Sequence, residues 1–256
     1  MEQVIERRDD GLPEIRKVDS GRPVIWLQRG WADFKKALAP SLIYGGWAAA
    51  FGFALLMVAW RSTYMVPALV GGFLLVAPFV AIVFYALSRQ IEQGRPVDGA
   101  EAVFAWRRNA GSIALWGLAL TLALILWERV AAILFALSYG GEVRNLETLL
   151  ADVLLSGRYV LLVLVYFAVG GLFALIVFAF GVVTAPMLLD RDVDVVTAAL
   201  TSLRACLANP AAALVWAVLI AVLTAIGFAT LMIGMVIIFP LLGHASWHAY
   251  RDLVQK

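Results

Sequence analysis

The chain has 256 residues, of which 63% are hydrophobic and 15% charged, with a formal net charge of +2. Soluble domains are nearer half apolar and a quarter charged, so this composition excludes an ordinary soluble fold and indicates a membrane protein. The small net charge gives no reason to expect a nucleic-acid partner. The single cysteine, Cys206, excludes an internal disulfide and any metal site built from several cysteines.

The first 22 residues predict a polar, flexible cytoplasmic tail in front of one membrane domain at 23–256. This segment is charged and has no apolar core, so we expect no signal peptide. Six apolar runs follow, each near or above the roughly 20 helical residues that cross a bilayer. The sequence therefore predicts an all-α fold, a polytopic membrane helix bundle with six transmembrane helices. These spans lie at about 41–60, 66–88, 111–137, 159–186, 210–227 and 230–248.

Basic residues are unevenly divided between the two sides that six spans would create. Leaving Arg129 aside, 16 lie on the side of the termini and three on the other side. The positive-inside rule then predicts that both termini are cytoplasmic, and we expect a multi-pass protein of the bacterial inner membrane.

Three stretches share an apolar spacing. After Val24 and after Val193 the apolar residues follow in steps of 3, 4, 3 and 4, and after Val97 the match holds only at its start. This spacing is typical of amphipathic helices, here at about 24–38, 97–108 and 193–207. Each precedes a pair of spans, so we expect an internal repeat of three units, each an amphipathic helix plus a transmembrane hairpin. A second similarity links the first and third units, because Arg89 and Arg251 each lie eleven residues after a proline.

The only two histidines, His244 and His248, are four residues apart and share one helix face. This is the spacing of two metal ligands on a helix, which makes a metal ion the one cofactor to consider. Two histidines so close on one helix cannot be the opposite axial ligands of one haem. Trp247 and Tyr250 lie beside them, which is typical of a membrane interface, and we favour a role at the interface or in hydrogen bonding within the bundle over a metal site.

Two further groups carry charge near or in the spans. Glu128 and Arg129 lie in the third span, where they would serve an ion or substrate path or a structural role at the far interface, which we favour. The run Asp190, Asp192 and Asp194 follows the fourth span. It would bind metal or protons, or, as we expect, Asp192 or Asp194 would cap the helix that begins near Val193.

Small residues form ladders that would let helices pack closely in lipid. Gly46, Ala50 and Ala54 form one in the first span, and Gly170 and Ala174 form a short one in the fourth. They fit packing within the chain, self-association or contact with other membrane proteins.

Three stretches resemble a family of bacterial integral membrane proteins known as domain of unknown function 2189. They are "GWADFKKALAPSLIYGG" (30–46), "APMLLDRDVDVVTAALTSLRACLANPAAALVWA" (185–217) and "FPLLGHASWHAYRDLV" (239–254). The resemblance implies a six-span membrane protein and supplies no active site. Some members are labelled cytochrome c oxidase subunit I. Such a subunit needs about six histidines from several helices, and this chain has two.

These observations leave three hypotheses for function. The first is a non-enzymatic accessory or scaffold component of a membrane assembly, supported by the small-residue ladders and the scarcity of catalytic groups. The second is a carrier or channel for an ion or small metabolite. The third is a metal-handling protein that uses His244 and His248. In each case the lipid bilayer is the first partner, and we rank the hypotheses in this order.

Overall fold

A computed structural model of the chain describes residues 12–61, 80–140, 152–153 and 156–255. The described residues fold into helices, and the one β-bridge among them joins Ile15 to Val254. In chain order the helices are α1 (Arg22–Lys36), α2 (Leu38–Arg61), α4 (Ile82–Glu92), α5 (Gly99–Val103), the 3-10 helix η2 (Ala105–Asn109), α6 (Ala110–Ser138), α8 (Val160–Gly181), α9 (Thr184–Asp190), α10 (Val195–Ala208), α11 (Pro210–Ala229) and α12 (Met235–Leu253).

Four stretches of the described residues are long and apolar enough to cross a membrane: Leu38–Val58, Gly99–Ser138, Val160–Asp190 and Pro210–Ala229. They overlap four of the six predicted spans. Most of the predicted span at 66–88 lies outside the described residues, which resume just before α4. The predicted span at 230–248 corresponds to α12, which is not among the four because two histidines, Arg251 and Asp252 make its second half polar.

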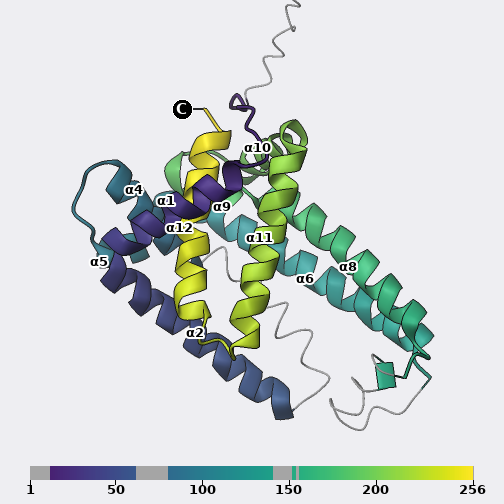
Figure 1. The fold of residues 1–256 in the computed structure, drawn as a ribbon. Coiled ribbons are helices and arrows are strands. Elements are labelled where there is room, and N and C mark those ends of the chain that lie inside the picture. The colour runs from purple at the N-terminus through teal and green to yellow at the C-terminus, as the bar shows by residue number, and fades with distance from the viewer. Residues whose placement is uncertain (1–11, 62–79, 141–151, 154–155, 256) are drawn as a thin grey trace, which may run out of the picture.

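The polar side-chain contacts gather at one end of the helices, which we call the polar end. Figure 1 shows how the helices are arranged around it. The C-terminus, α1 and α10 lie at one end, and the turn between α11 and α12 lies at the other. Helices α6 and α8 run side by side away from α2, α11 and α12. The core gathers at the polar end around α4, where every residue from Ala81 to Ser88 is buried.

The amphipathic segments depart from the prediction only in the second unit. Helices α1 and α10 overlap the stretches predicted at 24–38 and 193–207. The stretch predicted at 97–108 is instead split into the short α5 and the 3-10 helix η2. Its apolar spacing fails after Phe104, and the backbone leaves the α-helical path at that residue.

The predicted span at 159–186 also differs in detail. Helix α8 ends at Gly181, and a break at 182–183 separates it from α9. Pro186 falls in the first turn of α9, where its missing N–H is not needed, so the helix continues to Asp190.

Helix α12 is packed so closely that three contacts leave room only for glycine. A Cβ on Gly30 of α1 would lie 2.7 Å from the backbone nitrogen of Ala245, and a Cβ on Gly243 would lie 2.8 Å from Phe84 of α4. A Cβ on Gly45 of α2 would meet the carbonyl oxygen of Val236 and lie 2.7 Å from Pro240 Cγ. α12 is therefore the central helix that α1, α2 and α4 share.

The predicted small-residue ladder of the first span has a different register. Gly46, its first member, has no atom within 4 Å of where its Cβ would be, and Ala50 and Ala54 are exposed. The neighbouring Gly45 makes the close contact instead. In the fourth span the ladder holds at Gly170, whose Cβ would lie 2.8 Å from Trp127 of α6.

The second half of the predicted flexible tail is paired with the C-terminus. Arg16 N donates to Leu253 O at 2.9 Å, and Gln255 N donates to Glu14 O at 3.0 Å. The Asn209 side chain accepts from Val18 N at 2.7 Å and donates to Arg16 O at 3.0 Å. Residues 12–20 thus lie along the polar end, while residues 1–11 lie outside the described part.

Candidate functional site

His244 is fully buried in α12 between two serines. Its Nε2 lies 3.0 Å from Ser41 Oγ of α2, and its Nδ1 lies 2.8 Å from Ser88 Oγ of α4. Both serines are fully buried too. Each ring nitrogen therefore has a hydroxyl partner, which leaves neither nitrogen free for a metal ion.

Asp33 of α1 joins this group to the second histidine. One of its oxygens, Oδ2, accepts from Ser88 Oγ at 2.8 Å and lies 2.8 Å from His248 Nε2. The carboxylate is 5% exposed. We call the connected residues the histidine chain. It consists of Ser41, His244, Ser88, Asp33 and His248.

An ionised Asp33 fixes the direction of every hydrogen bond in the histidine chain. A carboxylate only accepts, so Ser88 must give it its single proton and accept from His244 Nδ1–H. In a neutral imidazole, His244 Nε2 then has no proton and accepts from the Ser41 hydroxyl. His248 donates from Nε2–H. The reverse order would need a protonated Asp33, so the charge on this carboxylate sets which ring nitrogen of a neutral His244 carries the proton.

The environment of Asp33 favours that charge. Burial by itself raises the pKa of Asp33, but the hydrogen bonds from His248 and Ser88 and the nearby histidines outweigh burial and lower the pKa below its ordinary value. The carboxylate is therefore ionised at neutral pH.

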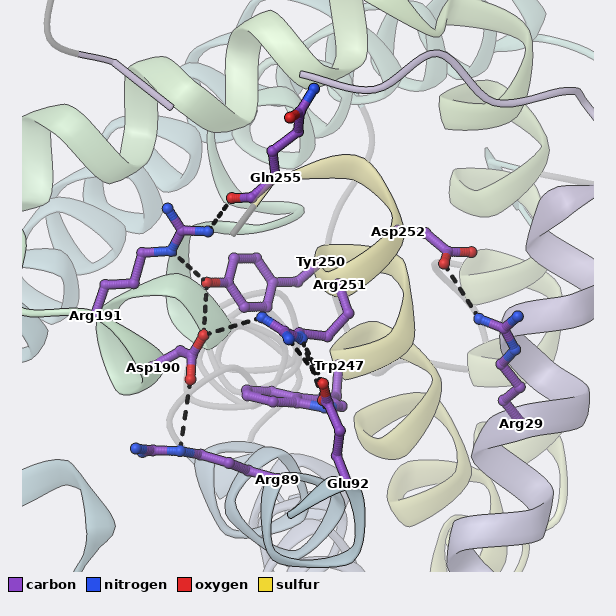
Figure 2. Close-up of polar contacts among 10 residues, drawn as sticks. All are labelled: Arg29, Arg89, Glu92, Asp190, Arg191, Trp247, Tyr250, Arg251, Asp252 and Gln255. Atoms are coloured by element: carbon purple, nitrogen blue, oxygen red, sulfur yellow. Dashed lines mark hydrogen bonds and ion pairs between the residues drawn. The ribbon is translucent and has the colours of Figure 1, made fainter. Parts of the chain in front are cut away.

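A second network shares helices α4 and α12 with the histidine chain and is drawn in Figure 2. Arg251 of α12 donates to Glu92 of α4 from Nη2 at 2.7 Å and from Nε at 3.0 Å. Glu92 also accepts from Trp247 Nε1 at 3.0 Å. Arg251 Nη1 lies 3.5 Å from Asp190 Oδ2 of α9. Arg89 Nε of α4 lies 3.5 Å from the other oxygen of the same carboxylate, Asp190 Oδ1. We call this network the arginine cluster. It consists of Arg89, Glu92, Asp190, Arg191, Tyr250 and Arg251.

Tyr250 is the buried centre of the arginine cluster. Burial and the adjacent carboxylate of Asp190 raise the pKa of Tyr250 to about 12, so its hydroxyl keeps its proton. That hydroxyl donates to Asp190 Oδ2 at 2.9 Å and accepts from Arg191 Nε at 2.9 Å. Arg191 also donates to the backbone oxygen of Gln255, which ties α9 to the C-terminal residues (Figure 2).

Asp252 attaches the start of α1 to the end of α12. Arg22 Nε donates to it at 2.6 Å, Trp26 Nε1 at 2.9 Å and Arg29 Nη1 at 3.1 Å. Burial raises the pKa of Asp252, yet these donors and the two guanidinium charges lower the pKa overall. The carboxylate is thus held as an anion.

The predicted aspartate run separates into three roles. Asp190 belongs to the arginine cluster, and Asp192 is exposed. Asp194 caps α10 by accepting from Val196 N at 2.8 Å and Thr197 N at 2.9 Å. The three carboxylates are therefore not gathered into one site.

Glu128 and Arg129 lie on α6, away from the polar end. They form no ion pair with each other, and Arg129 is exposed. The Glu128 side chain is half-buried, and its Oε1 is buried without a hydrogen-bond partner among the residues that the structure describes. The structure therefore leaves Glu128 as the one predicted residue whose polar atom is unexplained.

The third hypothesis needs a set of side chains that could hold a metal ion. Within the described ranges, no group of three or more histidine, cysteine, aspartate or glutamate side chains is arranged to hold an ion. His244 and His248 both lie on α12 and are connected through Ser88 and Asp33.

Sequence reasoning overlooked the partners of the histidines. Asp33 is the only acidic residue within α1, and Ser88 is one of few polar residues in its apolar run. Those are the signals that were present. The hydrogen bonds of the histidine chain hold α1, α2, α4 and α12 together. The apolar grooves beside α6, of about 440 and 400 Å³, are lined by none of its members.

Comparisons with known proteins bear on the membrane domain alone. No curated protein and no solved structure matches the chain. A family model described as "Predicted integral membrane protein (DUF2189)" matches residues 65–190. The match covers the middle of the chain, whereas the three stretches that suggested the family lie mostly outside it. Residues 65–190 are therefore similar to the DUF2189 family of predicted integral membrane proteins.

Proposed function

We propose that the protein is a non-enzymatic accessory or scaffold component of a membrane assembly. The observation that carries this proposal is the exposure of the α6–α8 hairpin. Only 11% and 6% of the most apolar windows of these two spans are buried, against 28% and 17% for the spans at α2 and α11. A hairpin that contacts little of its own bundle leaves two long faces for the helices of another membrane protein or of a second copy.

The polar end supports the same proposal. The hydrogen bonds within the histidine chain and within the arginine cluster join α1, α4, α9 and α12. Buried polar groups that are fully hydrogen-bonded fix one arrangement of helices. A rigid base carrying a protruding hairpin suits a scaffold better than an enzyme, which needs an accessible reacting group.

We further propose six spans in three repeated units, with the polar end cytoplasmic in a bacterial inner membrane. In the second and third units, the residue after the shared valine is an aspartate that caps the next helix. Asp98 accepts from Ala100 N at 2.8 Å, as Asp194 does from Val196 N. The second helices of the three units, α4, α9 and α12, bring Arg89, Arg191 and Arg251 to the same cluster. Basic residues crowd that end, which supports its cytoplasmic side.

Site-specific photo-cross-linking in the native membrane tests the scaffold proposal. A photoreactive amino acid at Phe167 or Leu172 on α8 is expected to give one discrete protein adduct, because both side chains are exposed on the hairpin. Matched probes at Val222 and Val218 on α11 lie at similar distances from the ends of their helix and are also exposed. They are expected to react with lipid only.

Adducts that are equal in yield at the α8 and α11 positions would contradict docking through the hairpin. Lipid adducts alone at all four positions would remove the support for an assembly role. An adduct with twice the mass of the chain would identify a second copy as the partner.

A carrier or channel for an ion or small metabolite is the second candidate, and Glu128 is the observation that favours it. Its Oε1 is buried within a span without a partner among the described residues, and unpaired carboxylates inside membranes often mark ion paths. If this function holds, Glu128→Gln should abolish flux in proteoliposomes while leaving the protein folded. Arg129→Gln, one residue along on an exposed position, is the matched control. Unchanged flux in Glu128→Gln would exclude this carboxylate from any path.

A further inference from the structure

Part of the apolar stripe that begins at Val24 faces away from the bundle, although Phe34 is buried and Leu27 packs against the core. The side of α1 that packs on α12 carries Trp26, Gly30 and Asp33, all buried. Val24 and Trp31 of α1 and Leu38 at the start of α2 are exposed instead, Trp31 by 42%. A helix whose aromatic and aliphatic residues point outward next to a membrane domain has one face for the protein and another for lipid.

Helix α10 and the 3-10 helix η2 have the same division. The buried side of α10 consists of small residues such as Ala198 and Ala205, while Val196, Leu200 and Leu207 are exposed, Leu207 by 71%. On η2, Trp106 is also exposed, and Phe104 just before it is half exposed. The three amphipathic segments thus present apolar side chains outward at three places around the polar end.

The short connections to the spans set the depth of these apolar faces in the membrane. Helix α1 runs directly into the span at α2, η2 into α6, and α10 into α11, with at most one residue between them. Each amphipathic segment therefore lies at the height where a span enters the bilayer. That is the layer of headgroups and upper acyl chains, where tryptophan is enriched.

Cations flank two of these faces. Lys35 follows Trp31 by four residues and so lies beside it on α1, with Lys36 next in the chain. On η2, the Arg107 guanidinium stacks over the Phe104 ring at 4.2 Å, with Arg108 next to it. All four are exposed, and none has a carboxylate within ion-pair distance among the residues that the structure describes. Unpaired cations beside outward aromatic rings complement a layer of phosphates.

We propose that α1 and η2 form a binding surface for anionic phospholipids. Val24 and Trp31 of α1, Leu38 at the start of α2 and Trp106 of η2 enter the upper acyl layer, and Lys35, Lys36, Arg107 and Arg108 bind the headgroup phosphates. The exposed apolar residues of α10 enter the same acyl layer at a third place around the polar end. A protein partner would need acidic groups at two separate places around the bundle, whereas an anionic leaflet supplies them everywhere.

The depth of α1 is tested with a spin label on the full-length protein, reconstituted in vesicles of phosphatidylcholine and phosphatidylglycerol. Labels are placed at Trp31→Cys and, as the polar control on the same helix, at Lys36→Cys. Position 31 is expected to collide with oxygen, which dissolves in lipid, and position 36 with a water-soluble nickel chelate. Equal nickel accessibility at both positions would overturn the proposal. Shielding of position 31 from both reagents would do so too, and would indicate a protein cover.

The headgroup preference is tested by native mass spectrometry of phosphatidylglycerol retained against phosphatidylcholine. Each cation near a bilayer surface changes lipid affinity by about fivefold. Lys35→Gln/Lys36→Gln is therefore expected to lower the phosphatidylglycerol preference by roughly thirtyfold. Arg16→Gln/Lys17→Gln removes the same charge at the same end but away from the apolar stripe, and is expected to keep the preference. An equal loss in both double variants, or none in the first, would overturn the proposal.

Discussion

Gly45→Ala is expected to lower the unfolding temperature of the purified protein by roughly 6–12 °C, whereas Gly46→Ala should not lower it. A Cβ at position 45 would meet the carbonyl oxygen of Val236 and the ring of Pro240, and neither group can rotate away. Helices α2 and α12 must then separate. Overpacking of this kind costs about 3 kcal/mol, and each kcal/mol shifts the unfolding temperature by about 2–4 °C in a chain of this size.

Gly46→Ala is a strict control because it makes the same change one residue along the same helix. Nothing lies within 4 Å of its Cβ position, and alanine is the better helix former. The measurement uses a thiol-reactive fluorogenic dye. Burial shields Cys206 and raises the pKa of its thiol to about 11, so the dye reacts as the protein unfolds. Equal unfolding temperatures for the two variants would show that α2 does not contact α12 through Gly45.

Asp33→Ala is expected to cost about 3 kcal/mol or more of stability. The carboxylate accepts two hydrogen bonds in a buried position, and hydrogen bonds to charged groups contribute about 1.5–3 kcal/mol each. Its removal leaves the buried Ser88 and the partly buried His248 without this acceptor. Asp192→Ala, which removes an exposed carboxylate at the same end, should change stability by less than about 0.5 kcal/mol.

The lowered pKa of Asp33 adds a pH signature with a definite sign. A carboxyl group whose pKa is lower in the folded state stabilises the protein above its unfolded pKa, about 4. That contribution is lost as the pH falls through the folded pKa. Between pH 7 and pH 3 the wild type should therefore lose more stability than Asp33→Asn, which cannot titrate. Parallel pH profiles for the two proteins would show that Asp33 is not the charged centre of the histidine chain.

The helices with local signals could be predicted from the sequence. Pro210 after Asn209 indicates where α11 begins, and the apolar run from Gly111 gives α6 to within about a residue at each end. These features depend on side-chain period and turn chemistry within one stretch of chain. The same holds for the cap at Asp194, which precedes its helix directly.

The histidine chain could not be predicted in the same way. Asp33 lies 55 residues from Ser88 and 215 from His248, and no local pattern states that α1 packs across α12. The two neighbouring glycines make the same point at smaller scale. Gly45 and Gly46 are equivalent in composition, and only the rotation of α2 against α12 decides which one is the contact. A local stretch of sequence therefore predicts that a helix forms, but it does not predict which side of that helix packs against another helix.

The scaffold role is tested most directly by native mass spectrometry of the protein in native membrane discs, extracted by a polymer without detergent. The account predicts a discrete species heavier than the 27.8 kDa chain, containing either another protein or a second copy. Phe167→Arg/Leu172→Arg on the exposed face of α8 should reduce that species to the single chain. A wild-type species of 27.8 kDa that carries lipid alone would contradict the account.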